Sequence, residues 1–284
     1  MTTDSTTTSP PLVVDQLAIL VRRSLRTSAR VPQLLMFSLT MPMAMLVLFS
    51  QVFRSVSDSP GFPAGVSYID FLTPAMLAVS TVMAGTNAGV AAAIDHTNGL
   101  HDRFSTLPMS PRLAGVARTI NEVLFTLVRG ALLVAAALAL GFRFHGGVLD
   151  AVAALAVLVT LAAAMSALFG RIGDRLRRPD VVQFAGMMIM MPFMFVSGAF
   201  APLSTMPAPM RTIAAANPVA HATDAIRGSV LGTADLSDTT IALATAVTLW
   251  AALTFIRRWP WQRSARIGAD VLGDAFRAAP EAQR

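Results

Sequence analysis

The ionisable side chains of this chain limit the chemistry that it can perform. Its 22 basic side chains are all arginine, and the sequence contains no lysine and no cysteine. A P-loop needs a lysine on the phosphates of ATP, and Schiff-base chemistry needs a lysine amine. Disulfides, thiolate metal sites and cysteine nucleophiles need cysteine. The motifs of zinc proteases, serine hydrolases and dinucleotide-binding domains are also missing, so the sequence predicts no catalysis within this chain.

Two histidines lie near carboxylates but do not have the spacing of a metal site. His96 and His101 are five residues apart, beside Asp95 and Asp102. A helical zinc site places its histidines four residues apart or adds a third convergent ligand. We therefore expect no metal site in this chain.

A few residues within apolar stretches are candidates for a translocation path. Arg129 would lie inside a membrane span, where an ionisable group is a functional hypothesis by default. A structural role is the alternative, with Asn87 as its partner, while Arg118 and Glu122 are expected to pair at i, i+4.

The same path is expected to use flexible methionines, whose thioethers suit varied hydrophobic cargo. A lipid-facing or core role for these methionines stays open. The path candidates are Asn87, Arg129, Met187, Met191 and Met194.

The composition places all of these residues in a membrane protein. Of 284 residues, 54% are apolar and 13% are charged, and the mean hydropathy is +0.61. A soluble domain carries about 25% charged residues, so the excess apolar surface needs lipid. Six stretches are long enough for a transmembrane helix. They are residues 32–53, 71–94, 120–142, 149–169, 181–200 and 239–256.

The arginines predict the orientation of an all-α polytopic membrane protein with six transmembrane helices. Seventeen of them fall on the side of the two termini, and four fall on the other side. Positive residues stay in the cytoplasm, so both termini are expected to be cytoplasmic. We expect the membrane itself to be a bacterial inner membrane. The same arginines would meet anionic lipid headgroups, and no soluble domain is left to bind nucleic acid.

The segments outside the spans divide the chain further. Residues 1–9 form a polar tail that we expect to be disordered, and residues 10–30 form an N-terminal amphipathic helix on the cytoplasmic face. Residues 31–256 make up the six-span transmembrane domain, and residues 257–284 form a basic cytoplasmic tail.

A short helix is expected in the cytoplasmic loop between spans two and three. Leu100, Phe104 and Leu107 recur at i, i+4 and i+7, and Pro108 ends the pattern. A short amphipathic helix parallel to the membrane suits docking into a groove on a soluble partner. An interfacial turn that faces lipid is the alternative.

The segment 201–238, before span six, is long, moderately apolar and interrupted by prolines. It predicts short re-entrant helices at the outer leaflet, buried against protein. Asp224 and Arg227 are spaced to pair at i, i+3. We expect an outer gate here, formed by Phe200, Asn217, Pro218, Asp224 and Arg227.

Three motifs resemble those of one transporter family. The loop contains D-R-F-x-x-L-P-M, span five ends in F-V-S-G-A-F, and residues 217–228 read N-P-V-x-x-x-x-D-A-I-R-G. With the basic lead-in and six spans, the chain resembles the ABC type-2 exporter permeases, specifically their daunorubicin-resistance membrane components. One departure is the segment 95–99, where the family often carries more charge.

The resemblance implies a permease that works as a dimer, with a second copy or a sister permease, and with a separate ATP-binding subunit. ATP and magnesium would bind to that partner, and this chain would hold no cofactor. Spans two and five would face each other across the dimer. A hydrophobic drug, as in antibiotic resistance, or a lipid-like substrate would move outward. Coupling to the ATPase would use Leu100, Asp102, Arg103, Phe104, Leu107, Pro108 and Met109.

Two other functions stay open from the residues. A membrane enzyme that modifies lipids would need a polar cluster, which His221, Asp224 and Arg227 could supply. A secondary transporter usually shows repeats and paired carboxylates at the midplane. Glu122 is the one carboxylate that we expect near a span interior, so that class has less support.

Overall fold

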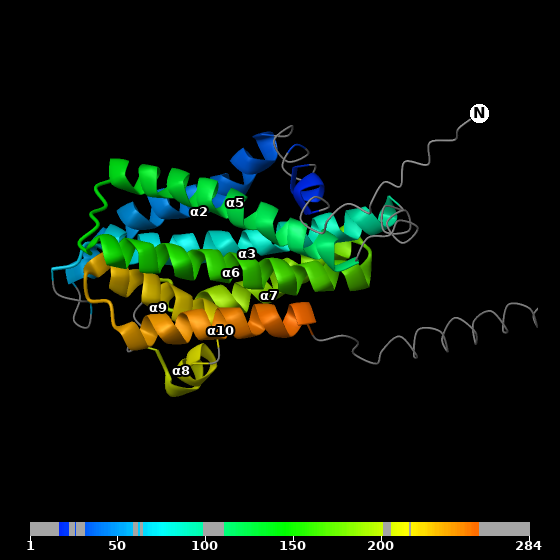
Figure 1. Cartoon of the computed structure of the whole chain (residues 1–284). Coiled ribbons are helices and arrows are strands. Elements are labelled where there is room, and N and C mark those ends of the chain that lie inside the picture. Colours follow the sequence, from blue (N-terminus) through cyan, green and yellow to red (C-terminus); the bar gives the residue numbers. More distant parts are fainter. Residues whose placement is uncertain are drawn as a thin grey trace, which may run out of the picture.

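The computed structural model describes residues 17–22, 26, 32–58, 62, 65–98, 111–200, 206–215 and 217–255. Its regular elements in these ranges are all helical, which confirms the all-α prediction (Figure 1). The described part of the expected amphipathic helix, residues 17–22 and 26, is also helical. The expected tails 1–9 and 257–284 lie outside the described residues.

The long helices run side by side in one bundle. In order they are α2 (Pro32–Val52), the short 3-10 helix η1 (Arg54–Asp58), α3 (Tyr68–Thr97), α5 (Pro111–Ala139), α6 (Val148–Leu176), α7 (Pro179–Val196), α8 (Ala208–Ala215), α9 (Pro218–Leu231) and α10 (Leu236–Phe255). Within the described residues, five helices are long and apolar enough to cross a membrane: α3, α5, α6, α7 and α10. The first expected span coincides with α2, and the part of α2 whose side chains are described contains the apolar stretch Ser38–Val52.

Two helices, α6 and α7, end at residues other than the expected limits of their spans. The fifth was expected to reach residue 200, but α7 ends at Val196, and Gly198 follows with φ of 69°. The fourth was expected to end at residue 169, but α6 continues to Leu176. It stops where Arg177 takes a left-handed conformation, and Pro179 then opens α7.

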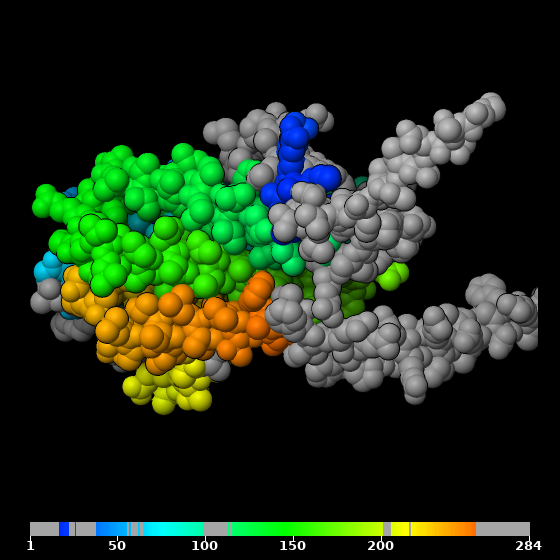
Figure 2. All heavy atoms as spheres, in the orientation of Figure 1, coloured from blue at the N-terminus to red at the C-terminus, as the bar shows by residue number. Residues whose placement is uncertain are grey.

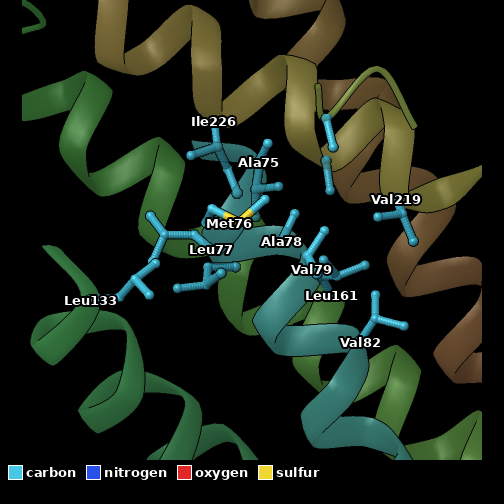
Figure 3. Packing of buried hydrophobic residues seen from close by; sticks show 14 of the residues in the cluster. Ala75, Met76, Leu77, Ala78, Val79, Val82, Leu133, Leu161, Val219 and Ile226 are labelled. Atoms are coloured by element: carbon cyan, nitrogen blue, oxygen red, sulfur yellow. The ribbon is translucent and has the colours of Figure 1, made fainter. Parts of the chain in front are cut away.

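Helix α3 forms the centre of the bundle. In its most apolar stretch 72% of the residues are buried, and it contacts α2, α5, α6, α7 and α9. Figure 3 shows Met76 and Leu77 of α3 pointing toward side chains of neighbouring helices. The buried partners in this view include Leu133 of α5 and Ile226 of α9. The second expected span is therefore mostly enclosed by its own chain.

Glycines bring α3 and α6 close together. Gly85 and Gly89 are four residues apart on α3, a spacing that lets two membrane helices approach closely. A Cβ on Gly89 would lie 2.6 Å from the carbonyl oxygen of Phe169, and a Cβ on Gly173 of α6 would collide with the backbone of Gly89. The two backbones touch, so α3 and α6 form a closely packed pair.

The helices late in the chain lie at the outside of the bundle. Only 22% of the most apolar stretch of α7 and 17% of that of α10 is buried. In Figure 2, α8 (yellow) protrudes from the bundle, in keeping with the exposure of most of its residues. By contrast, α9 packs against α3, α6 and α10. The expected short helices before the last span are present as α8 and α9.

Candidate functional site

The beginning of α9 is connected to the end of α7 by one side chain. The Oδ1 atom of Asn217 accepts a hydrogen bond from the amide of Val219 at 2.9 Å and caps α9. Its Nδ2 atom donates to the carbonyl oxygen of Phe193 at 2.9 Å, near the end of α7. Pro218 occupies the first turn, where a missing amide costs nothing. The Asn-Pro pair thus joins two helix ends.

Arg227 connects α9 to two other parts of the chain. Its Nη1 atom donates to Oδ1 of Asp224 at 2.8 Å, which confirms the expected i, i+3 pair. Nη2 donates to the carbonyl of Gly198 at 3.0 Å, and Nε donates to that of Phe71 at 3.3 Å. All three guanidinium nitrogens are therefore used, and the whole residue is 9% exposed.

Burial changes the acid–base behaviour of this pair. Removal from water lowers the pKa of Arg227 to about 10, although Asp224 acts in the opposite direction. Burial also raises the pKa of Asp224 above its ordinary value, and the charge of Arg227 limits that rise. Arg227 remains protonated at neutral pH, so it can hold its three acceptors.

Aromatic rings gather beside this pair. The Phe200 ring packs against Phe49 at 5.2 Å and against Phe195 at 5.6 Å between ring centres. The hydroxyl of Tyr68 donates to the carbonyl of Phe200 at 3.4 Å. Phe200 therefore lies where the ends of α2, α3 and α7 meet. The structure brings the five expected gate residues to one end of the bundle, and their role as a gate stays a prediction.

The five path candidates do not share one surface. Met187 and Met191 are exposed on α7, at 60% and 54%, and Asn87 is exposed on α3. Met194 and Arg129 are instead buried, Met194 within the main hydrophobic cluster. Two of the five path candidates are therefore buried, and the other three are exposed.

The expected pairing of the arginines in α5 was wrong. Arg129 contacts Glu122 and donates to Oγ1 of Thr126 at 3.2 Å, both on its own helix, and within the described residues it forms no hydrogen bond with Asn87. Residues three and seven positions apart lie on the same face of a helix. The buried positive charge of Arg129 is therefore paired with the negative charge of Glu122 on the same face of α5. Arg118, expected to pair with Glu122, contacts carboxylates of α3 and α6 instead.

Asp70 is a structural residue that sequence reasoning missed. Its side chain is buried in the first turn of α3, and Oδ1 accepts a hydrogen bond from the amide of Arg143 at 2.8 Å. It thereby holds the α5–α6 turn against α3. A signal was available, because Ser67 and Asp70 have the spacing of a capping box at a helix start, and Ser67 does cap α3.

The expected coupling segment cannot be placed. Its residues Leu100, Asp102, Arg103, Phe104, Leu107, Pro108 and Met109 lie outside the described residues. The helices on either side are described: α3 ends at Thr97 and α5 begins at Pro111. Among the described residues, no group of three His, Cys, Asp or Glu side chains could hold a metal ion.

Comparison with known proteins identifies the family. The model of the ABC-2 type transporter family matches residues 15–231, which include every helix from α2 to α9. The chain belongs to the ABC-2 type transporter family. It is a multi-pass membrane permease component, and the bacterial inner membrane fits this family.

Two curated permeases of known name are similar to this ABC-2 chain. It is 32% identical over 218 residues to the daunorubicin resistance ABC transporter permease protein DrrB1 of Streptomyces coeruleorubidus, and the match covers 75% of each chain. It is 26% identical over 219 residues to the putative transport permease ycf38 of Porphyra purpurea, covering 76% of this chain and 74% of the relative.

Proposed function

We propose that this chain is the transmembrane subunit of an ATP-driven exporter that moves a hydrophobic drug or lipid-like substrate outward. The family match over residues 15–231 carries the proposal. The relative named for daunorubicin resistance supports a drug-like substrate. The lack of lysine supports a partner ATPase that binds ATP and magnesium, because this chain cannot supply a P-loop.

In this proposal the chain crosses the membrane six times, with α2 as the first span and both termini in the cytoplasm. The arginine distribution supports this orientation, because it predicts a cytoplasmic location for segment 99–110 and an outer location for α9. The partner ATPase would contact segment 99–110 through Phe104 and Leu107. A second permease copy or a sister permease would complete the transporter.

The exposed side chains of α7 and α3 are the proposed walls of the path. Met187, Met191 and Asn87 are exposed in the single chain. In a dimer they could face the other permease, where flexible methionines would accept varied apolar cargo. Phe200, Asn217, Pro218, Asp224 and Arg227 would then form the outer gate, because they join α7, α9 and α3 at one end.

Reconstitution tests this function directly. The chain would be co-expressed with the ATP-binding subunit that forms a complex with it, purified and placed in liposomes. We expect ATP-dependent transport of daunorubicin, and Phe104→Ala or Leu107→Ala should uncouple ATP hydrolysis from transport without unfolding the permease. Arg211→Gln, at an exposed position of α8, is the control.

Three outcomes would contradict the proposal. Transport driven by an ion gradient without ATP would indicate a secondary transporter. Chemical conversion of a lipid by the purified chain without nucleotide would indicate an enzyme. Unchanged coupling in both loop variants would remove the assigned role of segment 99–110.

A further inference from the structure

Four ionisable side chains join three helices at the end of the bundle next to segment 99–110. They form the Arg118 cluster: Asp95 and His96 of α3, Arg118 of α5 and Asp174 of α6. Nη2 of Arg118 lies 3.5 Å from Oδ2 of Asp95, and Nη1 lies 3.6 Å from Oδ1 of Asp174. Nε2 of His96 lies 3.5 Å from the same Asp174 oxygen. One guanidinium therefore bridges carboxylates of two different helices.

The fold makes room for this guanidinium. The side chain of Arg118 is only 14% exposed, whereas those of Asp95 and Asp174 are 42% and 50% exposed. A Cβ on Gly170 of α6 would lie 3.3 Å from Nη1 of Arg118, so the glycine leaves the space that the arginine fills. A partly buried, planar arginine with several partners holds geometry better than an isolated exposed pair.

The Arg118 cluster lies close in the sequence to segment 99–110 and close to the contact between α3 and α6. Asp95 is in the last turn of α3, just before segment 99–110, and Arg118 follows that segment in α5. In the same half of the bundle, Gly89 of α3 and Gly173 of α6 bring the two backbones into contact. The pair α3–α6 is thus closely packed. The beginning of α5, where Leu113 and Ala117 are buried, also packs in the bundle, and the ion pairs of Arg118 add a polar connection to α3 and α6.

We propose that Arg118 is a positioning residue that holds the beginning of α5 to the α3–α6 pair, so that movement of segment 99–110 moves all three helices together. This role rests on the proposed function, because it assumes that a partner ATPase acts on segment 99–110. Without Arg118, α5 could move at this end while α3 and α6 stay in place. ATP hydrolysis would then continue with less transport.

Spin-label distances test the connection itself. The chain contains no cysteine, so pairs of introduced cysteines are the only labelling sites in the permease. Gly115→Cys and Leu176→Cys are at exposed positions of α5 and α6 near the cluster, and Leu138→Cys and Leu149→Cys are at exposed positions of the same helices near their other ends. In the complex with the ATPase, Arg118→Gln should broaden the 115–176 distances and leave the 138–149 distances unchanged.

The ratio of transport to ATP hydrolysis tests the consequence. In liposomes, Arg118→Gln should lower daunorubicin transport per ATP by about fivefold or more, the size of a modest coupling between sites, while ATP hydrolysis changes less than twofold. Asp174→Asn, which removes one of the two carboxylates, should have a smaller effect in the same direction. Arg175→Gln, an exposed arginine on the same turn of α6, is the matched control and should resemble the wild type.

The outcomes separate this inference from the proposed function. Unchanged 115–176 distances, or an unchanged ratio of transport to hydrolysis, would overturn the role of Arg118 while the wild-type complex still transports. Broadening of both the 115–176 and the 138–149 distances in Arg118→Gln would mean a general loss of structure and would also overturn it. A wild-type complex without ATP-driven transport would contradict the proposed function instead.

Discussion

Arg227 contacts Phe71 in two ways, although the residues are 156 positions apart in the sequence. Its Nε atom donates to the Phe71 carbonyl, and its guanidinium carbon lies 3.8 Å from the centre of the Phe71 ring. A cation over an aromatic face gains electrostatic energy that increases when water is excluded. The beginning of α3 and the middle of α9 are therefore joined by a single side chain.

The first prediction concerns this contact. Arg227→Gln should lower the free energy of unfolding by about 2–3 kcal/mol, because hydrogen bonds from a charged donor are lost and Asp224 loses its partner. Arg227→Lys keeps the charge but loses the planar donors, so we expect a smaller loss. Thermal unfolding of the purified permease in detergent measures both. Arg211→Gln at the exposed surface of α8 should change stability little, and an equal loss there would contradict the prediction.

The second prediction concerns pH. Because burial raises the pKa of Asp224 in the folded chain, the folded state binds the proton more tightly than the unfolded state does. The stabilisation that Asp224 contributes is fully present below the ordinary pKa of aspartate, and it is lost as pH rises through the raised pKa. Asp224→Asn should therefore weaken the fall in unfolding temperature between about pH 4 and pH 7.

Asp235 provides a contrast with the opposite sign. Hydrogen bonds from Ser237 lower the pKa of this exposed carboxyl, so its contribution is present above the ordinary pKa and is lost as pH falls through the lowered one. Asp235→Asn should thus affect stability at neutral pH and lose its effect in acid. Equal pH profiles for the two variants would contradict both assignments.

The third prediction concerns the contact between α3 and α6. Gly89→Ala places a methyl group 2.6 Å from a backbone oxygen that cannot move aside cheaply, so it should cost about 1–3 kcal/mol of stability. Gly115→Ala is the matched control, because its Cβ meets nothing within 4 Å and alanine favours a helix. It should be neutral or should stabilise by up to about 1 kcal/mol. Similar unfolding temperatures for the two variants would contradict the close packing.

The fourth prediction concerns the buried pair Glu122–Arg129. Arg129→Met leaves the carboxylate of Glu122 buried without its partner and should cost about 3–5 kcal/mol. The double variant Glu122→Gln/Arg129→Met removes both charges and should recover most of that stability. Thermal unfolding and a double-mutant cycle measure the coupling. If the double variant is stable but does not transport, the Glu122–Arg129 pair has a role in transport; normal transport would make the pair structural.

Part of this fold follows directly from the sequence. Long apolar stretches predict helices because lipid offers no hydrogen-bond partner to the backbone, and α3, α5, α6, α7 and α10 coincide with expected spans. The short helices expected within segment 201–238 are present as α8 and α9. The pair Asp224–Arg227 was also predictable, because neighbours at i, i+3 lie on one face whatever surrounds the helix.

Contacts between helices were decided by the tertiary structure. Sequence spacing favoured Arg118 with Glu122, but the rotation of α5 turns Arg118 toward Asp95 of α3 and Asp174 of α6, while Glu122 pairs with Arg129 on its own helix. The burial of Met194 and the exposure of Met187 depend in the same way on which face of α7 meets the bundle.

The sequence by itself thus determined the membrane class, the approximate positions of the helices, the local pair Asp224–Arg227 and the family, because these depend on hydropathy and near neighbours. Only the tertiary structure decided that Gly89 meets Phe169 and that Arg227 meets Gly198 and Phe71. The physical reason is that such partners depend on how closely two helices approach and how each is rotated. Small residues and shape complementarity along the whole interface set both quantities.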